Sequence, residues 1–314
     1  MRSNFEFLNR YWPALAQIGA TAETYVYSDP NACIYKLGMF SERLVQEILT
    51  FEHIAEPTID NNHANRIRLL KRAGLLPREI DNTLYVLRKT RNSAVHTGAD
   101  SIEEAKTLLS LTYNLAVWFM ETYGDWGYIA PGFVMPSETT HGDLESVIAE
   151  QEKKIEELTK QLEVVTTAAS GKTKKERLRR SESVSAMMNW NEAQTRCLID
   201  EQLRLSGWEA DTQSLRYSKG TRPVKGRNIA ISEWPTNSAF SQKGYADYAF
   251  FVGEKLVALM DAKKMSEDVA ATIDVQVKDY AAHIRTEDLP HTVGSWNGYQ
   301  VPFLFASNGR AYLE

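Results

Sequence analysis

The chain has 314 residues, a net charge of −5, and 43% hydrophobic and 25% charged residues. This composition predicts a soluble globular protein with two domains, or one domain and a module, and excludes the overall basic charge of many nucleic-acid-binding proteins. Two cysteines, Cys33 and Cys197, exclude a disulfide framework and suit a reducing cytosol. Because no apolar run approaches ~20 residues and the first residues lack a signal-peptide core, we expect a cytoplasmic protein without a membrane partner.

Residues 1–135 have apolar side chains at helical spacing and are predicted to form an α-helical bundle. The expected helices cover Phe5–Ile18, Asn31–His53, Asn65–Ala73, Pro77–His96 and Ser101–Tyr123. Two starts are well marked, because Pro77 favours the first helical position and Ser101 with Glu104 is typical of a capping box.

Residues 136–185 are predicted to link the bundle to a second domain. A heptad seam from Leu144 to Val165 indicates either a short coiled coil or a single amphipathic helix lying on a neighbouring domain. The following segment, Lys172–Arg180, holds six basic residues and one acid, Glu176. It is interpreted either as a phosphate-contacting cluster or as a solvated linker.

Residues 186–314 change to alternating helices and strands, so the whole chain is predicted to be α+β, with an α/β domain at its C-terminal end. The expected elements are a helix over Asn191–Leu205, strand-like pieces in Trp208–Gly220 and Asn228–Ser232, a helix over Val269–Ile284 and a strand over Pro302–Ala306. Between them, the apolar runs Tyr245–Val252 and Leu256–Met260 flank Gly253-Glu254-Lys255, which predicts a β-hairpin.

The hairpin carries one acid in each run, Asp247 and Asp261, and a lysine at position 263. Antiparallel pairing would bring Asp247 close to Asp261, and Lys263 would point to the same face as Asp261. Carboxylate oxygens suit Mg²⁺, which can activate water for phosphodiester hydrolysis. The pattern therefore predicts a metal site, with the backbone carbonyl of Ala262 as a further ligand and Lys263 positioning water. The alternative is two surface acids and a solvated lysine.

The same residues resemble the core of the PD-(D/E)xK nucleases, and more narrowly the N-terminal nuclease domain in the R subunits of type I restriction enzymes. Three features carry this resemblance in order: Asn191-Glu192-Ala193-x-Thr195-Arg196-x-Leu198-Ile199-Asp200 followed by Gly207-Trp208, then Asp247, Asp261 and Lys263, and last Gln276-x-x-x-Tyr280. The match covers roughly residues 189–310. It departs from the motif at Ala246, where the name has Pro, and at Asp261, where Glu is more usual.

The resemblance implies a restriction-endonuclease-like domain with a central mixed sheet and Mg²⁺-dependent cleavage of double-stranded DNA. By analogy, Asp247 and Asp261 hold the metal and Glu192 is a helix acid close to it. The Gln276 and Tyr280 pair would contact DNA or brace the site. The alternative implied by the same motifs is a non-catalytic module that binds DNA and docks onto other subunits.

The resemblance also implies partners: the modification and specificity subunits of a restriction complex. In that family an ATP-driven motor follows the nuclease domain, yet these residues contain no phosphate loop of the form G-x-x-x-x-G-K-[ST]. We therefore expect the native chain to continue into a motor domain, and expect ATP only there.

A second motif lies in the helical half. Arg91-Asn92-Ser93-Ala94-Val95-His96 resembles the R-x(4–6)-H motif of HEPN domains. That resemblance would imply metal-independent RNA cleavage, with His96 as acid or base and Arg91 stabilising the phosphorane. The alternative is that Arg91 and His96 cap and pack the end of a helix.

Overall fold

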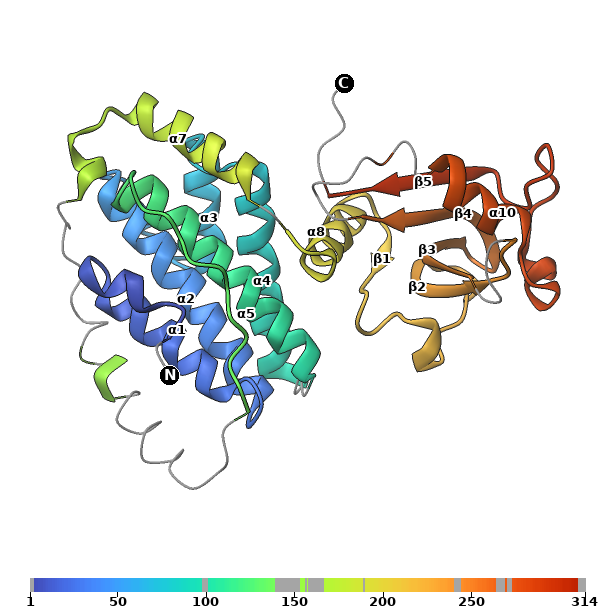
Figure 1. Ribbon diagram of the computed structural model, residues 1–314, viewed down its shortest axis with the longest axis horizontal. Helices are drawn as coiled ribbons and strands as arrows, with labels where there is room; N and C mark the ends of the chain where they lie inside the picture. The colour runs from blue at the N-terminus through green and yellow to red at the C-terminus, as the bar shows by residue number, and fades with distance from the viewer. Residues whose placement is uncertain are drawn as a thin grey trace. The chain divides into compact units, whose positions relative to one another are not determined.

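A computed structural model describes residues 3–97, 101–138, 153–155, 157, 167–188, 190–239, 244–263, 269 and 273–309. The chain divides into two compact units, Met1–Met188 and Asn189–Glu314. The first unit is helical and the second contains a mixed β-sheet, which confirms the α+β prediction (Figure 1). None of the helices in the described ranges is long and apolar enough to cross a membrane.

The predicted helical bundle is confirmed in the first unit. Its long helices are α1 (Pro13–Tyr25), α2 (Pro30–Phe51), α3 (His63–Arg72), α4 (Arg78–Thr97) and α5 (Ile102–Phe119). The side chains of Asp29, Asn62 and Ser101 each accept a backbone N–H at a helix start, so these residues set where α2, α3 and α5 begin. Helix α2 packs against α1, α4 and α5 and forms the centre of the bundle.

The predicted continuous helix over Phe5–Ile18 is wrong. Residues Glu6–Arg10 form a 3-10 helix, and α1 begins only at Pro13. Proline lacks the N–H that would continue the earlier turn, and its fixed φ suits the first position of a new helix. The helix is therefore interrupted at Tyr11 and Trp12.

The basic segment is part of helix α7 (Lys174–Met187), which belongs to the first unit. Arg177 Nη2 lies 2.7 Å from Glu52 Oε2, and Arg180 Nη2 lies 3.3 Å from Glu121 Oε2. These two arginines therefore help to attach α7 to the bundle. The predicted heptad seam lies outside the described residues except for Ile155, which is helical and buried.

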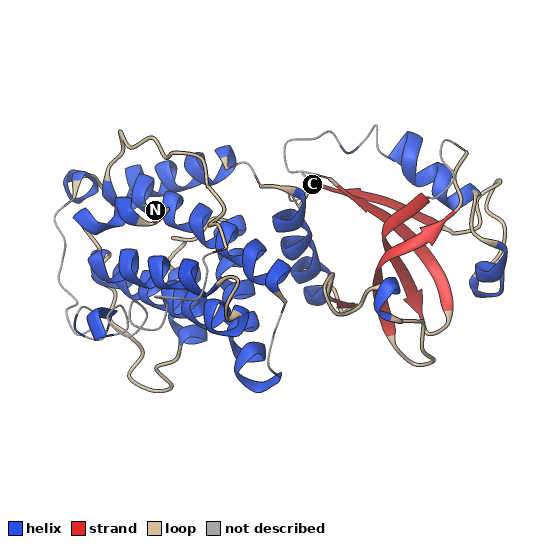
Figure 2. Ribbon diagram, turned by 60° about the horizontal axis from the view of Figure 1, so that its bottom comes forward, coloured by secondary structure: helices blue, strands red, loops and turns tan. Residues whose placement is uncertain are grey.

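The second unit contains α8 (Glu192–Leu205), β1 (Glu209–Ala210), β2 (Asn228–Thr236), β3 (Gly244–Val252), β4 (Lys255–Ala262), α10 (Lys278–Ala282) and β5 (Phe303–Ser307). The sheet order is β1-β2-β3-β4-β5, in which β2, β3 and β4 pair antiparallel while β1 and β5 join in parallel. Figure 2 shows this sheet strongly curled. Ile199 of α8 packs in the core on one face, and Ala281 of α10 packs in the core on the other.

The predicted hairpin is confirmed as β3 and β4. Tyr248 pairs with Met260, and the turn contains Gly253 at φ 61, a conformation that favours glycine. Continuing this register by one residue places Asp247 opposite Asp261. Of the predicted helix over Val269–Ile284, Val269 is helical, and Ile273–Val277 form a π-helical turn that continues into α10.

Helix α8 is tied to β3 by a buried hydrogen-bond network. The Tyr248 hydroxyl lies 2.9 Å from Asp200 Oδ1, and the Thr212 N–H donates to Asp200 Oδ2 at 2.8 Å. Burial raises the pKa of Asp200 to about 6, against the lowering effect of the Thr212 hydrogen bonds. This network fixes the helix on the sheet next to the candidate carboxylates.

Candidate functional site

The structure brings Asp247, Asp261 and Lys263 together at the end of the hairpin. The Asp247 and Asp261 side chains are 12% and 6% exposed. Asp247 Oδ2 accepts the Ala262 N–H at 2.6 Å. Lys263 Nζ lies 2.9 Å from Asp261 Oδ2 and pairs with that oxygen. The lysine therefore balances the charge of this buried carboxylate.

The two carboxylates and the lysine influence each other's proton affinity. Burial raises the pKa of Asp247 to about 7; the nearby Asp261 adds to this, and the charge of Arg196 opposes it. Burial alone would lower the pKa of Lys263, but its pairing with Asp261 raises it. At neutral pH Lys263 is therefore a protonated donor that can orient water or a phosphate oxygen.

Of the two predicted supporting residues, Tyr280 lies by the carboxylates. Burial and the neighbouring charge of Asp261 raise its pKa, and Lys263 partly opposes this shift. Its ring packs so tightly that a Cβ added at Gly244 would lie 3.0 Å from Tyr280 Cε1. Gln276, four residues earlier, is exposed in the π-helical turn.

Glu192 reaches the site through an arginine that sequence reasoning left without a role. Arg196 Nη2 lies 2.7 Å from Glu192 Oε1, and the same nitrogen contacts Asp247 Oδ1. The Glu192 side chain is 52% exposed and that of Arg196 only 18%. Arg196 belongs to the motif that suggested Glu192, so its position one helical turn later was a usable signal.

Glu233 is a second residue that the sequence analysis missed. It adopts a left-handed φ of 52 in β2, between the pairs Ser232–Tyr248 and Trp234–Ala246. Its Oε1 lies 3.6 Å from Arg196 Nη1 and 3.2 Å from Arg216 Nη2. Strained backbone in a non-glycine residue persists where surrounding contacts hold it, often at functional sites. An acid inside an apolar strand was the available sequence signal.

The site thus combines acidic and basic side chains, and the acids Glu192, Glu233 and Asp247 all contact Arg196. Within the described ranges, no group of three or more Asp, Glu, His or Cys residues could hold a metal ion on its own. Asp247 and Asp261 instead form a two-carboxylate site, and the metal-binding role of Glu192 stays a prediction.

A basic loop follows β1. Between positions 216 and 227 it contains five basic residues and no acid. Arg216 pairs with Glu233, and Arg227 pairs with Glu209. The other three, Lys219, Arg222 and Lys225, are exposed. Because Arg216 and Arg196 share Glu233, this loop adjoins the carboxylate site.

The second predicted motif has a structural use for its arginine. Arg91 Nη1 lies 2.7 Å from Glu42 Oε2, and the guanidinium carbon lies 5.0 Å from the centre of the Tyr35 ring. Asn92 is exposed, and the His96 side chain lies outside the described residues. The contacts of Arg91 favour the packing alternative over metal-independent RNA cleavage.

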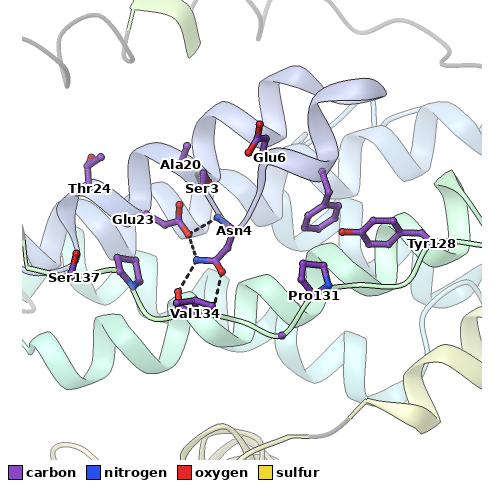
Figure 3. Close-up of a pocket in the computed structure, with 13 residues that line it drawn as sticks. Ser3, Asn4, Glu6, Ala20, Glu23, Thr24, Tyr128, Pro131, Val134 and Ser137 are labelled. Atoms are coloured by element: carbon purple, nitrogen blue, oxygen red, sulfur yellow. Dashed lines mark hydrogen bonds between the residues drawn. The ribbon is translucent and has the colours of Figure 1, made fainter. Parts of the chain in front are cut away.

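A cavity of about 760 Å³ lies in the helical unit and not at the carboxylates (Figure 3). It is lined by Phe7, Thr24, Tyr128 and Val134, among others. Glu23 Oε1 accepts hydrogen bonds there from the backbone and side-chain nitrogens of Asn4. The Glu23 carboxylate of this cavity therefore holds the N-terminal segment in place.

Two comparisons with known proteins show what the chain is similar to. A family model for the second domain of the type I restriction enzyme EcoKI endonuclease subunit matches residues 209–314. The chain is also 29% identical over 388 residues to the type I restriction enzyme EcoKI endonuclease subunit of Escherichia coli (strain K12), an alignment that covers 99% of this chain and 33% of that protein. The chain therefore spans about a third of the length of that relative. No solved structure matches it. The chain is therefore similar, over almost its whole length, to part of the endonuclease subunit of a type I restriction enzyme.

Proposed function

We propose that this chain is the nuclease part of a type I restriction enzyme subunit, and that its second unit cleaves double-stranded DNA with Mg²⁺. The observation that carries the proposal is the pair Asp247 and Asp261, which lie opposite each other with Lys263 beside them. The similarity to an endonuclease subunit supports the same reaction class.

The residues at this site fit a divalent cation. Asp247 and Asp261 are both largely buried carboxylates that lie close together, and two such acids are costly to bury side by side unless a cation binds them. Asp247 and Asp261 would hold the ion, with the backbone carbonyl of Ala262 as a further oxygen ligand. Oxygen ligands of this kind are what Mg²⁺ prefers, and a bound Mg²⁺ lowers the pKa of water and neutralises phosphate charge.

The chain's own groups have separate tasks in this proposal. Lys263 carries a proton at neutral pH, so it donates to the attacking water or to a phosphate oxygen and does not act as the base. The Tyr280 ring packs against Gly244 close to the carboxylate pair, where it would brace the site. Gln276 is exposed and free to reach DNA next to the site.

The rest of the restriction system belongs to the proposal as well. Because the chain spans only a third of its relative, we propose that modification and specificity subunits, and an ATP-driven motor in the same native chain, act together with these residues. The helical unit would then serve as a docking module.

Plasmid cleavage tests the proposal. The full chain should convert supercoiled plasmid DNA into nicked or linear DNA in Mg²⁺ but not in EDTA. Asp261→Ala or Lys263→Ala should abolish this cleavage. Glu254→Ala and Lys255→Ala, at the exposed turn of the same hairpin, are matched controls that should retain it. Equal activity in Asp261→Ala would refute the assignment. Metal-free RNA cleavage that is lost in His96→Ala would instead support a ribonuclease.

A further inference from the structure

Arg196 lies where a metal ion and the protein would compete for the same carboxylate. Asp247 Oδ2 is already held by the Ala262 N–H at 2.6 Å, so Oδ1 is the oxygen that the backbone leaves open. Arg196 Nη2 covers that oxygen. A divalent cation at Asp247 would therefore meet a second positive charge at contact distance, in a site where little water screens the repulsion.

The guanidinium has other partners close by. Arg196 Nη2 also binds Glu192 Oε1 at 2.7 Å, and Nη1 lies 3.6 Å from Glu233 Oε1. If it left Asp247, Arg196 could stay between Glu192 and Glu233 without becoming a buried unpaired charge. The Arg196 side chain can thus adopt two arrangements: one in which it pairs with Asp247, and one in which it pairs only with Glu192 and Glu233.

We propose that Arg196 is a positioning residue that holds Asp247 while no divalent ion is bound and gives up this carboxylate when the ion binds. This inference rests on the proposed metal site and adds a competitor to it. In the metal-free protein, the positive charge of Arg196 offsets the repulsion between the Asp247 and Asp261 carboxylates. On metal binding, the ion takes over this role and Arg196 moves to Glu192 and Glu233.

Arg196 is separable from the fold. The Asp200, Thr212 and Tyr248 network attaches α8 to the sheet independently of the arginine side chain. Moreover, Arg196 Nε is a buried nitrogen without a hydrogen-bond partner, so the side chain is not optimally placed for a purely structural role. A glutamine at this position should therefore leave the unit folded.

Ca²⁺ binding by the full chain, followed by isothermal titration calorimetry at about pH 8.5, tests the inference. Arg196→Gln should bind Ca²⁺ about tenfold more tightly than the unsubstituted chain, within the usual range for coupling between two bound groups. Arg204→Gln is the matched control, because Arg204 lies on the same helix, is 21% exposed and pairs with Glu201. Its Ca²⁺ affinity should not change.

A second measurement separates competition from a general loosening of the site. Without metal, Arg196→Gln should unfold at a lower temperature than the unsubstituted chain, and saturating Ca²⁺ should remove most of this difference. Equal or weaker Ca²⁺ binding in Arg196→Gln, with clear binding by the unsubstituted chain, would overturn the role of Arg196 alone. Binding that survives Asp261→Asn, or is absent from every variant, would overturn the proposed metal site itself.

Discussion

Replacing Asp247 with asparagine should stabilise the metal-free second unit at alkaline pH. The side chain is 12% exposed, and burial raises its pKa to about 7 from an ordinary value of 3.8. The folded state therefore binds this proton more tightly than the unfolded chain does. The contribution of Asp247 to the free energy of unfolding is therefore most favourable below about pH 4. It falls as the pH rises towards 7 and levels off above that value.

The magnitude follows from the two pKa values. Their difference, about 7 minus 3.8, is about 3 units. One unit corresponds to about 1.4 kcal/mol, so the ionised Asp247 would lower the free energy of unfolding by on the order of 4 kcal/mol at pH 8. Asparagine can still accept the Ala262 N–H, and it does not ionise, so the variant should lose this pH dependence.

Hydrogen–deuterium exchange of peptides that cover 244–262 provides the assay, because it reports on this hairpin separately from the helical unit. Exchange would be measured in EDTA at several pH values and corrected for the intrinsic rate. The difference in protection between Asp247→Asn and the unsubstituted chain should grow between pH 5 and pH 8. Asp211→Asn, in a loop of the same unit, is the control. Parallel pH profiles for Asp247→Asn and the unsubstituted chain would refute the reasoning.

Three further predictions concern other parts of the molecule. Replacing Lys219, Arg222 and Lys225 with alanine should weaken duplex DNA binding and lower the slope of log affinity against log salt by about 3, measured by fluorescence anisotropy. An unchanged slope would show that the basic loop does not touch phosphates. Tyr248→Phe removes a hydroxyl bonded to a buried carboxylate and should cost about 1–2 kcal/mol in urea unfolding of the second unit. An unchanged midpoint would contradict that role. Glu42→Gln removes the carboxylate that holds Arg91, so the helical unit should melt several degrees lower by circular dichroism, roughly the effect of 1 kcal/mol or more. No change in melting would reopen a functional role for the arginine.

Local patterns predicted the hairpin and the approach of its acids. Alternating apolar residues and the Gly253 turn set the pairing of β3 with β4, and the register then follows residue by residue. The contact between Arg196 and Asp247 joins residues 51 positions apart. It depends on how α8 packs on the sheet, and no short-range pattern contains that information.

The errors have equally specific causes. The apolar residues across Phe5–Ile18 keep helical spacing through the break, while the missing N–H of Pro13 is the local feature that ends the first turn. Glu233 sits at an irregular point of β2, where a left-handed residue interrupts the pairing. Such strain arises from tertiary contacts, so a strand pattern alone predicted only the position of the strand.

Two of the contacts between helix α8 and strand β3 have different consequences for the site. Arg196 and Asp200 lie one turn apart on the helix, and their partners Asp247 and Tyr248 are consecutive in β3. Releasing Arg196 leaves the Asp200 contact in place, eight residues along α8 from Glu192. The Arg196 side chain can therefore change partners near the start of α8 while the buried middle of the helix keeps its place on the sheet. The switch thus needs only a change of side-chain rotamer at one helix position, and the fold of the unit does not have to move with it.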